Sequence, residues 1–464
     1  MKKDRFFTAV YCPPYPPKGK YPNRITEEVY QILKDVGVDH IFGHFEDSYG
    51  WNYVTDAMDI CDKLGLTYFP RLRIYEQYLA ITGGYHVKDG VTYTSRTDEE
   101  KAAIGAEFLR QVDSVSNHEC FGGIYFGDES AYGAIEGIAE AKKLFLEKYP
   151  DKEFHYNNLN YCFSDVHLFG GENAEGYHVL TGDLECKSEN RFNRYRYLID
   201  KYVKVVQPEY LTTDFYPFGW AWRHIPTSVH RGMYELNSIF ADYKAKNKGM
   251  RSYQYIQVGY WDDEVRLNTR AEMALQMNIT LAYGHEGFAF FPGVFPNDFL
   301  DESPSQWEYG KGGICGLIDA YGKPTMYADF AKEILADLQA FAPIMLNSEF
   351  LGVATVGEYH NGFDCVDISV FADNDALYTG WLPEWGRYEG ELPEIATNSQ
   401  LFIGVFKQES GKKAYFVVNN STLIKANATL KLQGAHTVIQ SGAQTEKDGE
   451  IYVCIPAGES ILIY

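Results

Sequence analysis

The sequence has little positive charge and no long apolar run. Its 464 residues contain 42 Lys and Arg against 64 Asp and Glu, a formal net charge of −22. Such a chain repels nucleic-acid phosphates and anionic membrane surfaces, so we expect neither as a partner. No stretch approaches the ~18 uninterrupted apolar residues of a membrane-spanning helix, and the first residues lack a signal-peptide apolar run. We therefore expect a cytoplasmic, bacterial protein, unless a signal peptide has been removed.

The cysteines form no recognisable framework. There are eight, widely dispersed, with no CxxC pair and no Cys/His spacing typical of zinc. Dispersed cysteines in an acidic chain are typical of a reducing compartment, where they act as small apolar residues. From the sequence we expect no metal and no cofactor.

Strand-like and helix-like segments alternate over the first 340 residues or so. The expected strands are 6–11, 38–45, 66–72, 121–127, 154–158, 210–213, 252–259 and 287–291. Eight such repeats predict an α/β fold, a (β/α)8 TIM barrel. The rival, an open doubly wound sheet, should carry a glycine-rich phosphate turn after the first strand, whereas Cys12-Pro13-Pro14 stands there.

The pattern changes near residue 349. Short β-prone runs separated by turn residues then recur to the end of the chain, with no long helical segment between them. This pattern predicts a C-terminal antiparallel β-sandwich domain. We expect a barrel over residues 1–345 and the accessory domain over 346–464, which offers a surface for a homo-oligomer; the oligomeric state stays open.

Acidic and aromatic residues follow several expected strands, where the active site of a barrel lies. Glycoside hydrolysis needs two carboxyl groups, one of them protonated. Glu129 and Asp214 follow strands four and six, and we expect them to be catalytic. Like-charge repulsion from Asp128 should raise the pKa of Glu129. Alternatively, Glu129 caps the next helix or pairs with a nearby arginine, and Asp214 forms a turn.

Further strand-end residues are expected to bind substrate. The aromatic composition of 16% mostly fills the core, but tryptophans after strands six and seven suit sugar stacking or, equally, a hydrophobic lid. The expected substrate-binding residues are Asp128, Glu46, His44, Arg71, Asn157, Asn158, Tyr216, Trp220, Trp222, Gln257 and Trp261.

The order of these segments resembles that of clan A glycoside hydrolases and their relatives. The resemblance rests on Gly123–Glu129, Thr212–Pro217, Arg270–Phe291, Gly316–Thr325 and Pro456–Leu462, and it spans the whole chain. It implies that Glu129 is the acid/base.

The resemblance fails at strand seven, where those enzymes carry a nucleophilic Glu and this chain has Gln254 and Gln257. A neutral amide cannot attack an anomeric carbon as a carboxylate does. The second catalytic group, which acts as nucleophile, is then Asp214, an acid among residues 262–264, or the substrate's own acetamido group. We expect a glycosidase with a carbohydrate substrate; the alternatives are a non-catalytic carbohydrate-binding barrel and a barrel lyase or metal-dependent hydrolase.

Overall fold

The structure, a computed structural model, describes ten stretches of the chain. They are residues 3–82, 86–88, 91–93, 97–130, 132–160, 191–218, 228–259, 267–297, 315–358 and 382–464. Trp220, Trp222, Trp261 and the acids at 262–264 lie outside these stretches. Within them, none of the helices combines the length and the apolar composition needed to cross a lipid bilayer.

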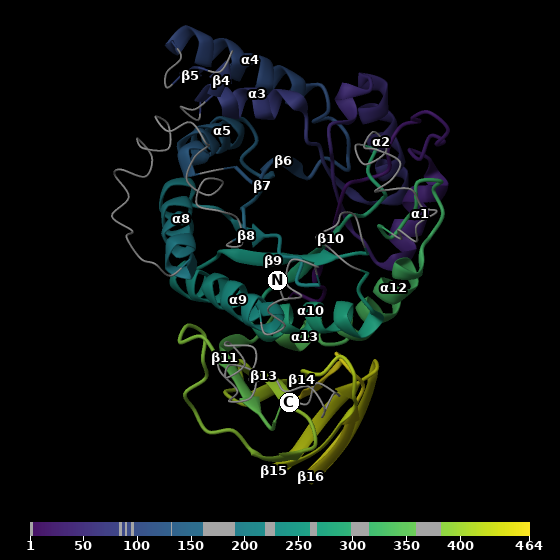
Figure 1. Cartoon of the computed structure of the whole chain (residues 1–464), viewed down its shortest axis with the longest axis vertical. Helices are drawn as coiled ribbons and strands as arrows, with labels where there is room; N and C mark the ends of the chain where they lie inside the picture. Colours follow the sequence, from purple (N-terminus) through teal and green to yellow (C-terminus); the bar gives the residue numbers. More distant parts are fainter. Residues whose placement is uncertain are drawn as a thin grey trace.

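A curled parallel sheet forms the centre of the molecule (Figure 1). Six strands pair in the order β3-β2-β1-β10-β9-β8, and β6 pairs with β7 beside them. All eight strands expected from the sequence are present: β1 (Phe7–Tyr11), β2 (His40–Phe42), β3 (Thr67–Phe69), β6 (Gly123–Asp128), β7 (Glu153–Asn157), β8 (Tyr210–Thr213), β9 (Arg251–Gln257) and β10 (Gly287–Phe291). The six-stranded sheet is a half-barrel.

Isolated parallel bridges connect the β6–β7 pair to both ends of the half-barrel. Tyr68 of β3 bridges to Phe121, just before β6, and Asn158, just after β7, bridges to Thr213 of β8. The backbone N–H of Asn158 donates to the carbonyl of Thr212 at 3.1 Å. The carboxyl ends of β6, β7 and β8 therefore lie side by side.

Helices surround the strands (Figure 1). Sequence signals place their ends: Thr26 caps one helix, and capping boxes pair Thr97 with Glu100 and Thr269 with Glu272. The helices are α1 (Glu27–Val36), α2 (Trp51–Leu64), α3 (Arg73–Thr82), α4 (Asp98–Asp113), α5 (Ile135–Lys148), α8 (Arg191–Val206), α9 (Ser228–Lys246), α10 (Arg270–Ala282), α12 (Met326–Gln339) and α13 (Ala342–Met345). The sequence did not predict α3 or the hairpin of β4 (His86–Lys88) and β5 (Val91–Tyr93).

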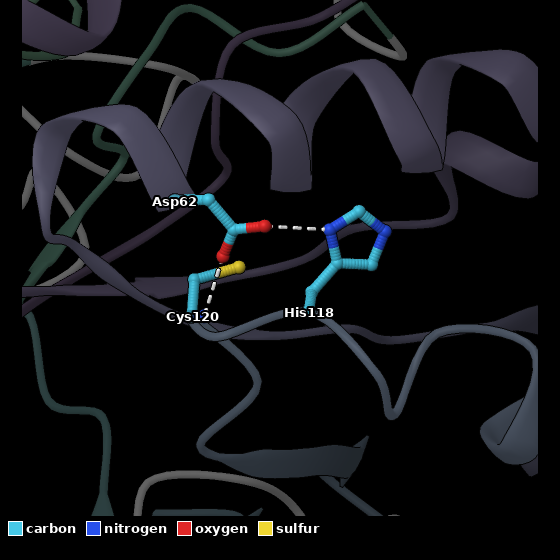
Figure 2. Close-up of side chains that lie close together, drawn as sticks. All are labelled: Asp62, His118 and Cys120. Atoms are coloured by element: carbon cyan, nitrogen blue, oxygen red, sulfur yellow. Dashed lines mark hydrogen bonds and ion pairs between the residues drawn. The ribbon is translucent and has the colours of Figure 1, made fainter.

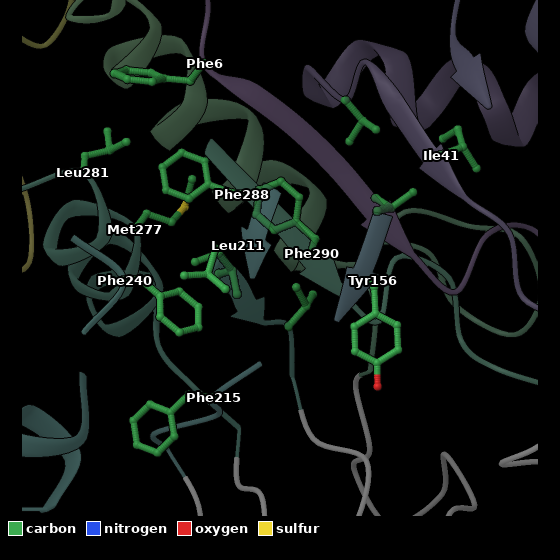
Figure 3. Packing of buried hydrophobic residues seen from close by; sticks show 14 of the residues in the cluster. Phe6, Ile41, Tyr156, Leu211, Phe215, Phe240, Met277, Leu281, Phe288 and Phe290 are labelled. Carbon is green, nitrogen blue, oxygen red and sulfur yellow. The ribbon is translucent and has the colours of Figure 1, made fainter. Parts of the chain in front are cut away.

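Strand alternation separates two apolar layers. Phe288 and Phe290 of β10 face the helices, where they pack in the cluster that contains Met277 and Phe240 (Figure 3). The alternate residues face the inside of the curl, which is filled mostly by aromatic rings: Phe7, Tyr11, Phe42, Phe69, Tyr125, Tyr210, Tyr253 and Tyr255. Much of the aromatic content is thus core.

The C-terminal part is an antiparallel sheet, ordered β11-β13-β14-β17-β15-β12 with β16 on β15. Its strands are β11 (Glu349–Val356), β12 (Glu394–Thr397), β13 (Leu401–Lys407), β14 (Lys413–Asn419), β15 (Ala426–Gln440), β16 (Ala443–Ile455) and β17 (Ser460–Ile463). The short β-prone runs of the sequence do not all form separate strands: β15 continues through a register shift between Lys431 and Ala435. The two-layer sandwich stays a prediction; the described strands form one sheet.

This sheet packs on α10 through a close backbone approach at Gly458. Asn278 of α10 donates to the carbonyl of Gly458 at 2.9 Å and accepts from Ser460 at 2.6 Å. Gly458 has φ +71°, and a Cβ there would lie 2.0 Å from the carbonyl oxygen of Ala271. Only glycine fits this position without a shift of the sheet.

Gly458→Ala is therefore expected to lower the free energy of unfolding by more than ~2 kcal/mol, measured by urea denaturation. Gly449→Ala is the matched control, because Gly449 has φ +73° with nothing within 4 Å. The control variant should lose only ~1 kcal/mol of the free energy of unfolding, the cost of a left-handed backbone at a residue other than glycine. Equal losses in both variants would contradict close packing at Gly458.

Candidate active site

The site begins where β6 ends. Asp128 is the last residue of the strand, and Glu129 follows with φ +52°, in the left-handed region that few non-glycine residues occupy. The backbone N–H of Glu129 donates to the carbonyl of Asn157 at 3.0 Å. This strained turn places the two consecutive acids at the end of the strand, and such strain is concentrated at functional sites.

Asp214 directly follows β8 and lies near Glu129, because its charge raises the pKa of the Glu129 carboxyl. Asp214 is 6% exposed, whereas Glu129 is partly exposed. Alternate strands place their backbones ~10 Å apart, and the long Glu129 side chain brings its carboxyl group within electrostatic reach of Asp214.

Asn157 holds the acids of both strands in place. Its Nδ2 donates to Oδ1 of Asp128 at 2.9 Å and to Oδ1 of Asp214 at 3.1 Å. Because β7 lies between β6 and β8, the last residue of β7 is centred between the two acids. Three carboxyl groups thus gather around one amide.

Arg71 supplies a positive charge. Its guanidinium lies 3.4 Å from Asp128 and 2.7 Å from Glu76, and its side chain is only 6% exposed. It also donates to the hydroxyl of Tyr11 and stacks 4.4 Å from the ring of Phe45. Arg71 therefore compensates the charge of Asp128. The main charge that acts on Glu129 is that of Asp214.

The pKa values of Glu129 and Asp214 are both raised. Burial, then the charges of Asp214 and Asp128, raise the pKa of Glu129 well above its usual range. Burial, then the charge of Asp128, raise the pKa of Asp214 to about 7, although the hydrogen bond from Asn157 acts to lower it. The sequence predicted the effect of Asp128, but burial is the larger cause. Both shifts favour the protonated form of the carboxyl group.

Tyrosines border the acids. The hydroxyls of Tyr125 and Tyr255 lie 2.8 Å apart, and Tyr125 also donates to Asp128 at 3.3 Å. Tyr216 is partly exposed, and its ring stacks on Phe291 at 5.3 Å. Sequence reasoning found Tyr216 but missed Tyr125 and Tyr255. Strand alternation would have found Tyr255, because it lies two residues before the end of β9 and therefore faces the same side as that last residue.

Three other expected residues use their polar groups inside the protein. Glu46 is fully buried and accepts from the hydroxyl of Tyr68 at 2.8 Å, and burial raises its pKa to about 7. His44 contacts the hydroxyl of Tyr15 at 2.8 Å. Asn158 donates to the carbonyl of Thr212 at 3.0 Å. These contacts hold the strand ends together.

Gln257, at the end of β9, uses its amide on the backbone. Its oxygen accepts from the N–H of Phe218 at 3.0 Å, and its nitrogen donates to the carbonyl of Phe218 at 3.1 Å. The side chain is fully buried. Gln257 therefore fastens the segment after β8 to the end of β9.

Removing Arg71 should reveal how strongly the site depends on its charge. Arg71→Met leaves Asp128 partly buried without its cation, and we expect a loss of ~3 kcal/mol in the free energy of unfolding. Arg110 is the control, because its pair with Glu107 is on the surface. Arg110→Met should leave the urea midpoint nearly unchanged. A midpoint for Arg71→Met equal to that of the control would contradict this role.

Proteins similar to this chain are found among solved structures. No protein-family model matches the sequence, and no curated protein is significantly similar to it. Its fold is similar to that of a β-galactosidase from Bacillus circulans sp. alkalophilus, with 10% identity, 99% of both chains covered and a TM-score of 0.48. It is also similar to the GH51 arabinofuranosidase from Xanthomonas axonopodis pv. citri, with 10% identity, 99% of this chain and 92% of that chain covered and a TM-score of 0.43.

A third similar structure is the GH2 β-galacturonidase from Eisenbergiella tayi, at 12% identity and a TM-score of 0.42. The alignment covers 72% of this chain, which spans about half, 51%, of that protein. The structural neighbours of this chain thus include glycoside hydrolases of several kinds, all at low sequence identity.

Proposed function

We propose that this chain is a glycoside hydrolase in which Glu129 is the general acid and Asp214 the second catalytic carboxyl. The observation that carries the proposal is the acid cluster at the strand ends: Asn157 donates to both Asp128 and Asp214, and burial and neighbouring charges raise the pKa values of Glu129 and Asp214. Glycoside hydrolysis uses two carboxyl groups, one of which a raised pKa keeps protonated. The partly exposed Tyr216 ring beside them suits the apolar face of a sugar.

We further propose that the eight parallel strands close into a (β/α)8 barrel over residues 1–345, with residues 346–464 as an accessory domain. The bridges from Tyr68 to Phe121 and from Asn158 to Thr213 support closure, because they join the β6–β7 pair to both ends of the half-barrel. The carboxyl pair then lies at the C-terminal face, where barrel enzymes carry their active sites.

The spacing of the pair favours a retaining reaction. An inverting enzyme needs ~6.5–9.5 Å between its carboxyl groups to seat a water, whereas a retaining enzyme uses ~5–5.5 Å. The charge of Asp214 raises the pKa of Glu129, an effect that favours the closer spacing. Asp214 is then the nucleophile, in place of the glutamate that strand seven lacks.

In the first step, Glu129 gives its proton to the glycosidic oxygen while Asp214 attacks the anomeric carbon. The bond to the leaving group breaks as an ester bond to Asp214 forms. In the second step, Glu129 takes a proton from water, which attacks the same carbon and releases Asp214. Asn157 holds the attacking oxygen, and Arg71 pairs with Asp128 nearby.

Asp128, Arg71, Asn157 and Tyr216 are proposed to contact the carbohydrate substrate. Trp220, Trp222 and Trp261 remain sugar-stacking predictions beyond the described residues. Glu46, His44, Asn158 and Gln257 are proposed instead to support the strand ends, because their polar groups contact the protein itself.

The experiment is a screen of the protein against a panel of aryl glycosides and natural oligosaccharides. We expect hydrolysis of at least one, and proton NMR should show that the first-formed sugar keeps the anomeric configuration of the substrate. A first product of opposite configuration would contradict Asp214 as nucleophile. Binding of sugars without any hydrolysis would contradict the enzyme proposal and favour a carbohydrate-binding protein.

A further inference from the structure

Asp62, His118 and Cys120 form a second group of chemically active side chains (Figure 2). Asp62 stands near the end of α2, while His118 and Cys120 lie in the loop between α4 and β6. This loop enters β6, and Glu129 follows the other end of that strand. The group is therefore at the opposite end of the parallel sheet, and its role is independent of the proposed function.

The ligand-capable atoms of this group converge. One from each residue, the Asp62 carboxylate, the His118 ring nitrogen and the Cys120 sulfur, all lie within 4.8 Å of one another. Asp62 Oδ2 is 2.8 Å from Nδ1 of His118, and Oδ1 accepts from the backbone N–H of Cys120 at 2.6 Å. Asp59, one helical turn before Asp62, adds a further carboxylate oxygen 3.7 Å from the same Nδ1.

We propose that Asp62, His118 and Cys120 form a structural binding site for a divalent transition-metal ion of the zinc class. Oxygen, imidazole nitrogen and thiolate sulfur are the donors that zinc prefers. Zinc bonds of ~2.0–2.3 Å set tetrahedral ligand atoms ~3.3–3.7 Å apart, so the side chains need only small shifts. Asp59 or a water completes the four ligands.

The surroundings allow a metal to enter and be held. The His118 and Asp62 side chains are 17% and 26% exposed and that of Asp59 is 65% exposed, while Cys120 is buried. On binding, the thiol proton passes to solvent, and the imidazole proton moves from Nδ1, where it faces Asp62, to Nε2. The metal would fasten the end of α2 to the loop that precedes β6.

A cysteine nucleophile or a purely hydrogen-bonded contact would each use these side chains differently. A cysteine nucleophile needs its base on the thiol, but Nδ1 of His118 faces Asp62 and the thiol contacts the carbonyl of Met58 at 3.4 Å. In a hydrogen-bonded contact, Asp62 accepts from His118 and from the backbone N–H of Cys120, and the thiol serves only as a weak donor. Metal binding alone uses the sulfur as a thiolate ligand.

The sequence did not indicate this site, because we expected from it no metal and no cofactor. The motif is His118-x-Cys120, and the third ligand lies 56 residues before His118. Zinc signatures join two pairs of closely spaced Cys or His ligands, whereas the second pair here consists of the aspartates Asp59 and Asp62 of α2.

The test uses the untagged chain, stripped with a chelator and titrated with Co²⁺ and then Zn²⁺. We expect one equivalent of Co²⁺ to give tetrahedral and thiolate-to-metal absorption bands that Zn²⁺ abolishes, and Zn²⁺ to raise the melting temperature. His118→Ala and Cys120→Ser should each weaken Zn²⁺ binding by more than the ~10–100-fold typical of losing an outer hydrogen-bond partner. Cys454→Ser, which removes an exposed thiol, should bind as the parent chain does.

Absence of the thiolate band in the parent chain at one equivalent would overturn the proposal, and this arm needs no variant. Unchanged Zn²⁺ affinity in Cys120→Ser would overturn it as well. A loss of stability in both variants that is the same with and without Zn²⁺ would show a hydrogen-bonded contact instead.

Discussion

Glu129→Gln is expected to lower kcat on any hydrolysed glycoside by ~10²–10⁴-fold, the usual contribution of a general acid. The amide keeps the size of the side chain but cannot give a proton to the leaving oxygen. Sugar binding should persist, because the ring and the other polar contacts remain. The loss should shrink for substrates with strongly acidic leaving groups, which depart without protonation. Steady-state kinetics on a series of aryl glycosides measures both effects.

The control for this variant is Glu136→Gln. Glu136 pairs with Lys201 on the surface, with its side chain 55% exposed, so its replacement should leave kcat and its leaving-group dependence unchanged. Near-normal turnover of Glu129→Gln on a substrate with a poor leaving group would remove Glu129 from the acid role.

Asp214→Asn is expected to abolish turnover while it stabilises the protein at high pH. Because the pKa of Asp214 rises from its ordinary 3.8 to about 7, the folded state binds more protons than the unfolded state between these values. Wild-type stability therefore falls as pH rises through that window. Asparagine does not ionise, so the variant avoids the cost of a buried charge. Its free energy of unfolding relative to wild type should therefore grow by roughly 4 kcal/mol from pH 4 to pH 8, an order-of-magnitude figure. Urea denaturation across this range measures it.

Asp113→Asn supplies a control of opposite sign. Hydrogen bonds from Lys148 and Tyr149 lower the pKa of Asp113, so its stabilising contribution is present above the ordinary pKa and is lost as pH falls. The variant should be less stable than wild type at neutral pH and equal to it in acid. A difference between Asp214→Asn and wild type that does not change with pH would contradict the burial of an ionisable Asp214.

The sequence predicted the parts of the site that depend on strand ends. Glu129 and Asp214 follow β6 and β8, and Asn157 ends β7. Parallel strands bring residues at their carboxyl ends together independently of the loop conformations. The placement of the Glu129 side chain was not predictable, because it depends on the left-handed turn at this residue. The sequence also identified Arg71, but its partners Asp128 and Glu76 emerge only from the tertiary structure.

The hardest residues to interpret from the sequence were those whose side chains form hydrogen bonds to residues distant in the chain. Gln257 sits where a catalytic residue was sought, yet its amide bonds to both backbone groups of Phe218, a contact that no spacing in the sequence reveals. Glu46 is likewise directed to Tyr68. The fold, by contrast, follows from local signals, since capping residues and alternation recur along the chain; α3 and the β4–β5 hairpin are short additions without such a repeat.

The most direct test of the central claim, that Asp214 and Glu129 act as nucleophile and acid, is azide rescue of Asp214→Gly. The variant should have lost at least ~10³-fold in turnover, and azide, entering the space of the missing carboxylate, should restore part of it. The product should be a glycosyl azide of configuration opposite to the substrate. Near wild-type hydrolysis by Asp214→Gly without azide would contradict these roles.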